Sequence, residues 1–485
     1  MQFLKTKFFL GLLCIVALGS MGFQNFILLQ EPVIDEELLT QAVQAADMGL
    51  TEGSFEFFDI YDCFAPESNI CFGNNPITPY GVVRAPLPEE DGTQPENSGI
   101  FLREDEAILI IGTTPPDSRY FGFTPYLYTR AGDPKRQMYY ASLTDTINLI
   151  KIKTTGSSLP GENVFKQTTA LVLTADHNMY NDMVSLLAQL NIPQTAVNHL
   201  EIPVTFPLYM GYDATTADDF SVLLRVTLSE NTSELDLYLQ SNPFLVYRIT
   251  PNTPRAIDPV PTRPYLAEGS GVTEEQTVPG ITSALDNLVT DIKRKYRVFR
   301  QNKVMITKTW YTEKIGHDCI LGLEFCSGDN HDALYGIDAA GAFKLSYDPN
   351  DFIIIAGVNH KLLGKALYSN HSVYKAANLG GIISAADDVY DGSAQYHAGR
   401  NQLHYNKLYA IKIARYCSSE EMFCVEIPEP TPDNPIGANV DDILMLLNRM
   451  YVDPATTVRP SIDEIIPSQA LAFKPRMSLV FKPGM

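Results

Sequence analysis

The sequence contains one cysteine-bearing pattern twice, and this repeat constrains the fold more than any other feature. Residues 71–81 read CFGNNPITPYG and residues 326–336 read CSGDNHDALYG, so cysteine, glycine, asparagine, tyrosine and glycine recur at identical offsets. An Asp-Cys pair precedes each block, at Cys63 and at Cys319. Matches of this many residues predict an internal duplication. The alternative is two unrelated β-rich stretches that match by chance.

The correspondence continues downstream of both blocks. Residues 106–112 (EAILIIG) match 351–357 (DFIIIAG) as short, apolar, β-branched runs that end in glycine, which is typical of a buried strand followed by a turn. Further strand pairs are predicted at 119–128 with 365–374 and at 169–174 with 408–413. Both copies end on Glu-Ile-Pro. We therefore place the first copy at 62–203 and the second at 318–428.

These patterns predict an α+β fold rich in strands, with two similar disulfide-stapled lobes from the duplication around a pseudo-twofold axis. The remaining strands are expected at 220–228, 235–250 and 303–311, and the helices at 34–47, 179–190 (capped by Asp176), 283–296 (capped by Ser283) and 440–450. The expected domains are a lead-in at 20–61, lobe 1 at 62–250, a Pro-rich linker at 251–281, lobe 2 at 282–428 and a C-terminal extension with one helix at 429–485.

The first 19 residues have the layout of a secretory signal peptide. Lys5 and Lys7 precede an apolar run at 8–18, and small residues follow it. An uncleaved membrane anchor is the alternative, because apolar residues resume at 26–29, but polar residues interrupt that run. We expect cleavage, and hence an extracellular protein or one in the lumen of the secretory pathway, with no later membrane span.

Removal of the signal peptide removes Cys14 and leaves an even number of cysteines in three local pairs. In a secreted chain this predicts disulfides. Zinc binding is the weaker alternative, since structural zinc sites usually have shorter gaps between paired cysteines. Two sequons predict N-glycosylation at Asn231 and Asn370 in a eukaryotic host. The predicted disulfides are Cys63–Cys71, Cys319–Cys326 and Cys417–Cys424.

The charge of the chain limits its partners. A formal net charge of −21 over 485 residues repels phosphate backbones and anionic lipids, so nucleic-acid binding is not expected. The expected partner is a small molecule or an extracellular polymer. No dinucleotide fingerprint and no nucleophile-elbow motif is present. Residues 357–365 have the wrong spacing for a phosphate loop, and residues 372–375 match Ser-x-x-Lys without its companion motifs.

Histidines are concentrated in the second copy, with six of eight between residues 317 and 404. The second copy has His331 and Asp332 where the first has Pro76 and Ile77, and it has His360 where the first has Pro115. Histidine with carboxylate forms a general base or binds a divalent metal. The alternative is surface histidines with turn-capping aspartates. The predicted catalytic residues are His331, Asp332 and His360, and the predicted ligands of one divalent metal are His317, Asp329 and His331.

These residues give three functional hypotheses. The first is a secreted hydrolase with a His/Asp site, metal-assisted or not, in lobe 2 or between the lobes. The second is a non-catalytic secreted or cell-surface binding or structural protein with an aromatic-lined ligand surface, and the third is a pH-responsive protein. Five rings in nine residues line such a surface or, alternatively, pack in the core: Tyr120, Phe121, Phe123, Tyr126 and Tyr128.

Overall fold

The computed structural model describes residues 34–58, 63–64, 71–88, 99–132, 135–204, 207–296, 302–338 and 342–475. The predicted signal peptide and Cys14 lie outside the described residues. In the described part, no helix is both long enough and apolar enough to cross a membrane. The fold is mixed α+β and rich in strands, with several sheets and three disulfides.

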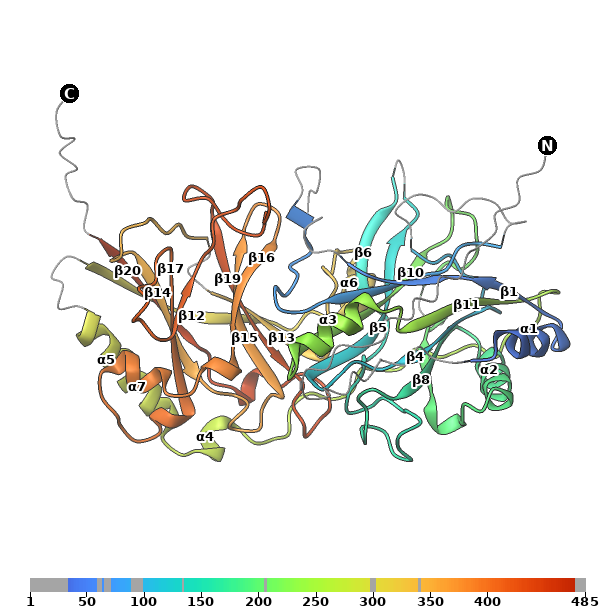
Figure 1. Cartoon of the computed structure of the whole chain (residues 1–485), viewed down its shortest axis with the longest axis horizontal. Helices are drawn as coiled ribbons and strands as arrows, with labels where there is room; N and C mark the ends of the chain where they lie inside the picture. Colours follow the sequence, from blue (N-terminus) through green and yellow to red (C-terminus); the bar gives the residue numbers. More distant parts are fainter. Residues whose placement is uncertain are drawn as a thin grey trace, which may run out of the picture.

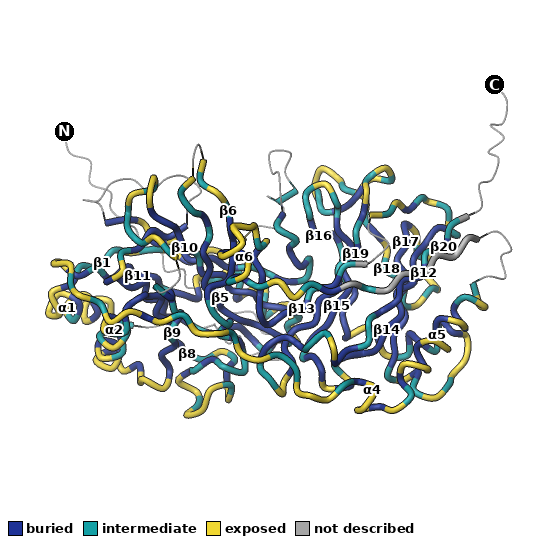
Figure 2. Tube along the Cα trace, turned by 180° about the vertical axis from the view of Figure 1, so that it is seen from behind, coloured by how far each residue is buried: buried dark blue, intermediate teal, exposed yellow. Residues whose placement is uncertain are grey.

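Two lobes lie side by side along the long axis of the molecule (Figure 1). We call residues 36–251 lobe 1 and residues 281–475 lobe 2. Buried chain runs through the strands of both lobes and continues across the junction between them (Figure 2). The sheets supply this core. In each strand every second side chain points to the same face, so several neighbouring strands together form one apolar face that can be buried.

Lobe 1 consists of two sheets and three helices, of which α1 and α2 pack on the outer sheet face and α3 packs against the core between the sheets. The helices are α1 (Glu36–Ala45), α2 (His177–Gln189) and α3 (Thr232–Gln240), with a 3-10 turn at Gln194–Ala196. The first sheet has the order β1 (Met48–Glu52), β11 (Phe244–Pro251), β4 (Ala107–Thr113), β8 (Thr168–Thr174) and β9 (Val197–Glu201). The second has the order β2 (Ser54–Phe57), β3 (Tyr80–Arg84), β10 (Asp219–Ser229), β5 (Ser118–Arg130) and β6 (Gln137–Ser142), and β7 (Ile147–Asn148) also pairs with β5.

The packing of lobe 1 follows from its sequence. The apolar run of β4 alternates between two cores, because successive side chains of a strand point to opposite faces. Ile108 and Ile110 pack with Phe121 of β5 between the sheets, and Leu109 packs with Met183 of α2 on the outer face. Strand β4 is therefore apolar along its whole length because both of its faces are covered.

Lobe 2 is built on one nine-stranded sheet. Its helices are α5 (Ile281–Tyr296), α6 (Gly316–Gly322) and α7 (Ser393–Ala398), with 3-10 turns at Asp387–Val389, Tyr405–Lys407 and Ile462–Glu464, and the short helix α4 (Glu274–Thr277) lies just before it in the chain. The strand order is β16 (Gly380–Ala386), β15 (Tyr368–Lys375), β19 (Leu444–Tyr451), β13 (Ala333–Asp338), β12 (Asn302–Thr312), β20 (Gln469–Pro475), β14 (Phe352–Val358), β17 (Leu408–Ala414) and β18 (Cys424–Glu426).

The halves of this sheet have the same strand order and direction as the two sheets of lobe 1. The order β12-β20-β14-β17-β18 corresponds to β1-β11-β4-β8-β9, and in both only the last pair is parallel. The order β12-β13-β19-β15-β16 corresponds to β2-β3-β10-β5-β6. Strand β12 takes the place of both β1 and β2, since it pairs with β20 along one part and with β13 along the other.

The residue pairing also corresponds. In lobe 1, Thr174 of β8 lies opposite Ala107 of β4 and next to Glu201 of β9. In lobe 2, Ala414 of β17 lies opposite Phe352 of β14 and next to Glu426 of β18. The Glu-Ile-Pro sequences that end both predicted copies therefore leave their sheets at the same position. The correspondence extends beyond residues 62–203 and 318–428, because β1, β10, β11, β12, β19 and β20 take part in it.

The local predictions are largely confirmed. The helices at 34–47 and 179–190 are α1 and α2, and Asp176 caps α2 through hydrogen bonds that its carboxylate accepts from the backbone. The predicted strands at 106–112, 119–128, 169–174, 351–357, 365–374 and 408–413 are β4, β5, β8, β14, β15 and β17. Helix α5 is also present, but it begins at Ile281, so Ser283 lies inside it instead of capping it.

Two segments differ from the prediction. The helix predicted at 440–450 is wrong: residues 444–451 form β19, which lies between β13 and β15, so pairing on both sides overrides the helix preference of leucine and methionine. The predicted C-terminal extension thus supplies two central strands of lobe 2, β19 and β20. The first part of the strand predicted at 235–250 is helix α3, because the Asn231 side chain caps it by accepting a hydrogen bond from the Glu234 amide.

Candidate functional site

The three predicted disulfides are confirmed, and two of them start segments that cross between the lobes. Cys63–Cys71 lies between β2 and β3, and Cys319–Cys326 lies at the corresponding place between β12 and β13. We call residues 71–78 the first arm and residues 326–332 the second arm. Cys417–Cys424 lies within lobe 2, where it joins the segment after β17 to the start of β18.

The first arm, from lobe 1, binds the edge of the lobe 2 sheet beside β16. The Cys71 amide donates to the Asn378 carbonyl at 2.7 Å, and the Gly73 amide donates to the Leu379 carbonyl at 3.1 Å. The Asn74 side-chain oxygen accepts a hydrogen bond from the Gly381 amide at 2.8 Å. The backbone of the arm thus extends the sheet as an edge segment.

The second arm, from lobe 2, binds β6 of lobe 1 in the same way. The Cys326 amide donates to the Tyr139 carbonyl and the Gly328 amide to the Tyr140 carbonyl, both at 2.8 Å. The Asp329 carboxylate accepts a hydrogen bond from the Ser142 amide at 2.8 Å. The two lobes therefore exchange equivalent arms, and β6 and β16 are equivalent edge strands.

The residues shared by the two cysteine blocks are those that make these contacts. Asn75 donates from its side chain to the Tyr368 hydroxyl at 3.2 Å, and Asn330 donates to the Tyr120 hydroxyl at 2.9 Å. The glycine of each arm has a positive φ, 66° at Gly73 and 69° at Gly328, a conformation that favours glycine. The repeated pattern thus encodes the attachment of each arm to the opposite lobe.

A buried arginine holds each arm in place. Arg225 of β10 donates to the Gly328 carbonyl at 2.9 Å, and its guanidinium carbon lies 5.8 Å from the Tyr80 ring centroid and 5.6 Å from that of Tyr126. The Tyr126 hydroxyl donates to the Asp329 carbonyl at 2.7 Å. Cation–π contacts of this kind compensate part of the lost hydration of a guanidinium.

Arg449 of β19 is the counterpart in lobe 2. It donates to the Gly73 carbonyl and to the Tyr374 hydroxyl, and its guanidinium carbon lies 5.5 Å from the Tyr335 ring centroid and 5.3 Å from that of Tyr374. Arg225 and Arg449 are only 4% and 3% exposed. Among the described residues, no carboxylate forms an ion pair with either guanidinium, in contrast to buried Arg248, which pairs with Glu106.

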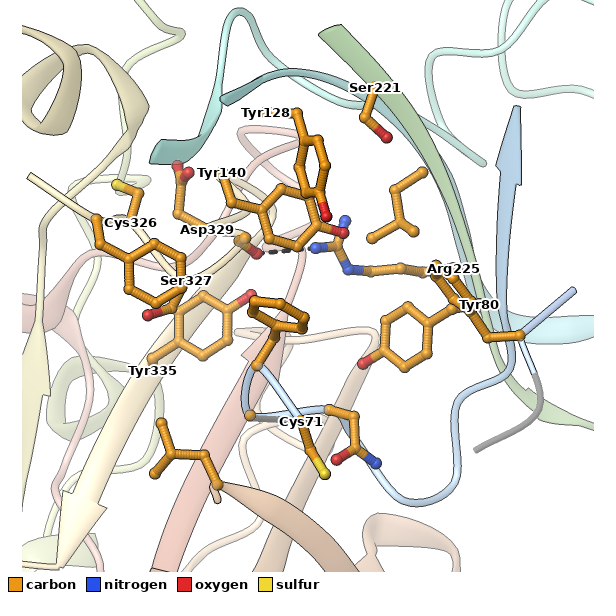
Figure 3. Close-up of a pocket in the computed structure, with 18 of the residues that line it drawn as sticks. Cys71, Tyr80, Tyr128, Tyr140, Ser221, Arg225, Cys326, Ser327, Asp329 and Tyr335 are labelled. Carbon is orange, nitrogen blue, oxygen red and sulfur yellow. Dashed lines mark hydrogen bonds between the residues drawn. The ribbon is translucent and has the colours of Figure 1, made fainter. Parts of the chain in front are cut away.

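A cavity of about 660 Å³ lies between the lobes and is lined by both arms, including Cys71 and Cys326, and by Arg225 and Arg449. Figure 3 shows part of this lining, with Arg225 between Tyr80 and Tyr140. Aliphatic side chains from each lobe, such as Leu223 and Leu447, form part of its wall. The aromatic rings that line it are Phe58, Phe72, Tyr80, Tyr128 and Tyr140 from lobe 1, and Phe325, Tyr335 and Tyr451 from lobe 2.

The charged groups of the cavity are mostly cationic. Arg84 and Lys314 line it in addition to the two buried arginines. Among the described lining residues, Asp329 is the one with an acidic side chain. Burial raises the pKa of the Asp329 carboxyl, although donors from Ser142 and Gly316 partly offset this effect. Burial also raises the pKa values of Tyr140 and Tyr335, so these phenols are neutral at physiological pH.

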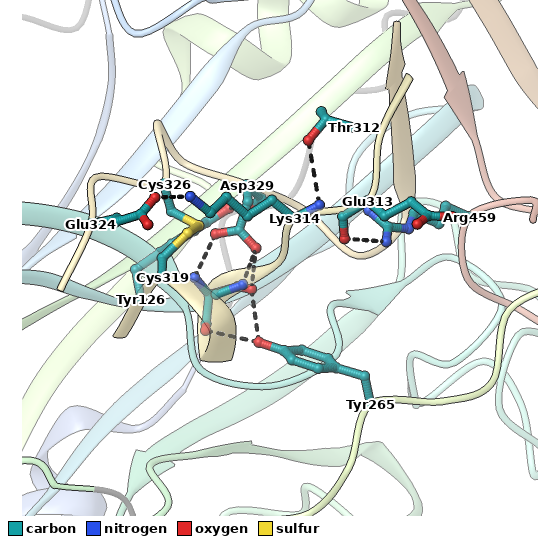
Figure 4. Close-up of a disulfide and its surroundings, with 12 residues drawn as sticks. Tyr126, Tyr265, Thr312, Glu313, Lys314, Cys319, Glu324, Cys326, Asp329 and Arg459 are labelled. Carbon is teal, nitrogen blue, oxygen red and sulfur yellow. Dashed lines mark hydrogen bonds and ion pairs between the residues drawn. A yellow bond between two sulfur atoms is a disulfide. The ribbon is translucent and has the colours of Figure 1, made fainter. Parts of the chain in front are cut away.

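Asp329 closes a hydrogen-bond cluster behind the cavity, next to the Cys319–Cys326 disulfide (Figure 4). Its carboxylate accepts from the Ser142 hydroxyl at 2.6 Å and from the Gly316 amide at 2.8 Å. The Tyr265 hydroxyl donates to the Ser142 carbonyl at 2.9 Å. The predicted metal ligand Asp329 is therefore fully occupied as the acceptor that ties the second arm to lobe 1.

His331 lies between two carboxylates. Its Nδ1 is 2.5 Å from Asp145 and its Nε2 is 3.1 Å from Glu268, and only 1% of the residue is exposed. Burial alone lowers the pKa of His331, but the hydrogen bonds to Asp145 and Glu268 outweigh burial, and the pKa is raised. Arg459 also donates to Glu268, at 2.8 Å. These contacts favour the protonated ring, which links Asp145 and Glu268 across the lobe junction.

Of the other predicted site residues, the structure brings His317 near His331, because the Tyr265 ring contacts both imidazoles, while His360 and Asp332 have other partners. His360 is buried, with its Nδ1 2.6 Å from Glu274, and Asp332 is buried, with one oxygen accepting from the Tyr120 hydroxyl at 3.0 Å. His317 Nε2 lies 2.8 Å from the Leu143 carbonyl. Over the described ranges, no group of three or more His, Cys, Asp or Glu side chains is arranged to hold a metal ion.

The two sequons differ in accessibility. Asn370 is completely buried in β15, and its side-chain nitrogen donates to Asn75, Ser372 and Ser384. A glycan on this nitrogen would disrupt that packing, so glycosylation at Asn370 stays a prediction that the burial of the side chain disfavours. Asn231 lies at the exposed start of α3, where its side-chain oxygen is used as a cap and glycosylation stays a prediction.

The aromatic cluster at 120–128 divides between core and cavity. Phe121 and Phe123 pack between the sheets of lobe 1, and Tyr120 packs at the lobe junction. Tyr126 contacts Arg225 behind the cavity wall, and Tyr128 lines the cavity. Of the five predicted rings, Tyr128 lines the cavity and the other four pack in the core or behind the cavity wall, so a ligand surface built on this cluster stays a prediction.

Sequence reasoning missed Arg225 and Arg449, which lie beyond both predicted copies. A usable signal was present in the sequence. Arg225 lies in the apolar strand β10, which precedes β11, and Arg449 lies in the apolar strand β19, which precedes β20. Counted to equivalent positions in the pairing with β4 and with β14, the spacing from the arginine to the following strand is the same in both lobes. Extending the repeat downstream would have aligned them.

Comparison with known proteins does not identify the chain. No known protein family matches the sequence, and no curated protein matches it significantly. Among solved structures, an uncharacterized protein from Burkholderia cenocepacia is similar over 90% of this chain and 87% of its own, with 10% sequence identity and a TM-score of 0.38.

Proposed function

We propose that this chain is a small-molecule-binding protein whose ligand occupies the cavity between the lobes. The single observation that carries this proposal is a cavity of about 660 Å³ whose rings and guanidinium groups come from both lobes. Binding cavities for drug-sized ligands measure roughly 300–1,000 Å³ and combine apolar walls with a few convergent polar groups. The rings supply the apolar contact area, and the buried arginines supply polar groups that fix orientation.

The proposal includes an internal duplication as the origin of the cavity. Matching strand orders, matching pairing registers and the reciprocal exchange of arms support it. Two equal lobes that insert arms into each other resemble a symmetric dimer, in which each subunit presents the same surface to its partner. Fusion of two such units into one chain places the cavity at the former dimer interface.

The binding hypothesis has better support than the hydrolase hypothesis. A general base needs a nitrogen that can reach the substrate, whereas both ring nitrogens of His331 face carboxylates. His360 is 1% exposed and paired with buried Glu274. We include secretion in the proposal, since three disulfides are typical of proteins from oxidising compartments.

The test is binding of a neutral apolar fluorophore, N-phenylnaphthylamine, to the full mature chain with its disulfides intact. We expect saturable binding of one probe per chain. Ser221→Trp fills the cavity from β10 and should abolish this binding, while Ser185→Trp, on the exposed face of α2, should leave it unchanged. Absence of binding to the folded protein, or equal binding by both variants, would overturn the proposal.

A further inference from the structure

The two buried arginines of the cavity define what kind of ligand it takes. An arginine side chain stays protonated in proteins, so each guanidinium carries a full positive charge. Burial of a charge without an opposite charge costs free energy. Around Arg225 and Arg449, the described partners are carbonyl oxygens, hydroxyl groups and tyrosine faces, which solvate a cation without neutralising it.

The remaining charges at the cavity do not balance these two. Lys314 and Arg84 each have an acidic partner, Glu324 for the former and Glu56, at 3.5 Å, for the latter. Asp329 directs its carboxylate to Ser142 and Gly316. Asp329 also interacts electrostatically with Arg225 and offsets part of its charge. Among the described lining residues, positive charge therefore remains in excess, and Arg449 has no carboxylate in an ion pair, although the formal net charge of the chain is −21.

We infer that the ligand is an organic anion, with a carboxylate, sulfonate, sulfate or phosphate group on an aromatic or otherwise apolar body. This inference rests on the proposed function and specifies the ligand of the same site. The planar fork of an arginine matches such anionic groups with two parallel hydrogen bonds. The surrounding rings accommodate the apolar body by stacking and edge contacts. Strongly cationic ligands are excluded by like-charge repulsion.

The experiment compares two probes of nearly the same shape. Anilinonaphthalene sulfonate is an anion, and N-phenylnaphthylamine lacks the sulfonate. We expect Arg449→Gln to raise the dissociation constant of the anionic probe at least about tenfold and that of the neutral probe less than about twofold. Arg449→Lys keeps the charge but lacks the planar fork, so it should restore only part of the anionic binding. Arg263→Gln, at an exposed arginine paired with Glu201, is the matched control and should change neither.

A second variant keeps the test decisive if Arg449→Gln does not fold. Arg84 and Lys314 are exposed at the cavity and contribute only surface ion pairs, so Arg84→Gln with Lys314→Gln should fold. This double variant should weaken the anionic probe selectively, and added salt should do the same. Equal effects on both probes would overturn the inference while leaving the cavity as a binding site. Failure of both probes to bind the wild-type protein would instead overturn the proposed function.

Discussion

Arg225 and Arg449 occupy equivalent positions in the two lobes, and each donates to a glycine carbonyl in the arm of the opposite lobe. Arg225 lies opposite Tyr80 in the pairing of β10 with β3, and Arg449 lies opposite Tyr335 in the pairing of β19 with β13. The two arginines that attach the arms to the opposite lobes therefore also line the cavity. Ligand binding and lobe association should be thermodynamically linked, because a ligand that binds only the assembled lobes stabilises them.

The first prediction concerns the disulfides that start the arms. Cys319→Ser with Cys326→Ser opens a short loop, and we expect the free energy of unfolding to fall by about 2–3 kcal/mol from chain entropy. We also expect weaker binding of N-phenylnaphthylamine, because Cys326 begins the second arm and lines the cavity, and the disulfide to Cys319 holds that end of the arm. Chemical denaturation and probe titration measure the two effects separately.

The third disulfide provides the matched control. Cys417–Cys424 has the same sequence separation of 7 as Cys319–Cys326 but lies within lobe 2, between β17 and β18. In the variant Cys417→Ser with Cys424→Ser, the free energy of unfolding should fall by a similar amount, but binding of N-phenylnaphthylamine should be unchanged. Equal loss of binding in the two double variants would show that general destabilisation, not the arm, controls the cavity.

The sequence permitted prediction of features that depend on local pattern. The apolar run at 106–112 can bury on both faces only inside a sheet, and Asp176 precedes a helical run at capping distance. The cysteine pairs are close in sequence, which made their pairing predictable. These features do not require knowledge of which segments meet in space.

The remaining features depend on long-range pairing. Nothing local in Cys71–Thr78 or Cys326–Asp332 says that these arms bind the opposite lobe, because their hydrogen bonds join residues about two to three hundred positions apart. The segment at 444–451 is rich in leucine and methionine, and only its neighbours β13 and β15 make it a strand. His331 and His360 lie close in sequence, yet they pair with different acids, Glu268 and Glu274, supplied by the segment before α5.

The second prediction concerns the position at which the arms differ, Asp329 in one and Asn74 in the other. Asp329→Asn replaces an acceptor of three hydrogen bonds with an amide that presents donors to Ser142 and Gly316. We expect a loss of about 1–3 kcal/mol in the free energy of unfolding, the cost of unsatisfied buried groups. Urea denaturation measures it.

Ser142→Ala is the companion variant, because it removes one donor to Asp329 and leaves the backbone bonds in place. Its cost should be smaller, about 1 kcal/mol. If Asp329→Asn proved as stable as the wild type, the carboxylate would not be what attaches the second arm to lobe 1.

The third prediction concerns glycosylation in a eukaryotic secretory host. We expect a glycan at Asn231 and none at Asn370 in secreted, folded protein, because the latter is completely buried. Peptide mapping by mass spectrometry after glycosidase treatment locates the modified site. Asn231→Gln should abolish the mass shift that the glycan causes. Asn370→Gln should leave the mass shift as it is in the wild-type protein. A glycan on Asn370 would contradict the packing of β15.

The fourth prediction uses a histidine that is buried as a neutral group. His397 has Nδ1 2.7 Å from the Tyr296 hydroxyl and Nε2 3.2 Å from the Phe423 carbonyl, and burial lowers its pKa to about 3. A histidine whose folded pKa is depressed below the unfolded value of about 6.5 destabilises the fold as pH decreases below about 6.5. We expect His397→Gln to reduce the loss of stability between about pH 6.5 and pH 4, as measured by urea denaturation. An unchanged pH dependence would contradict a neutral His397.

The fifth prediction concerns His331, whose titration has the opposite sign. Its pKa is raised, so its contribution is fully present below the unfolded pKa of about 6.5 and is lost as pH increases through the folded pKa. The pKa values of Asp145 and Glu268 are lowered, so their contributions are present above about pH 4.5 and are lost as pH falls through their folded pKa values. The ion pairs of His331 with Asp145 and Glu268 should therefore stabilise the lobe junction most between about pH 4.5 and pH 6.5.

His331→Gln isolates this effect because the other titrating groups are common to both proteins. The variant should lose most stability relative to the wild type near pH 5.5, and the difference should shrink well above the folded pKa of His331, where the wild-type ring is neutral. Arg459→Gln should reduce stability with a weaker pH dependence, since it also pairs with Glu268 but does not titrate in this range. Urea denaturation at several pH values measures both differences. A penalty for His331→Gln that is the same at pH 5.5 and at pH 9 would show that the ring acts through packing against Tyr265 instead of through its charge.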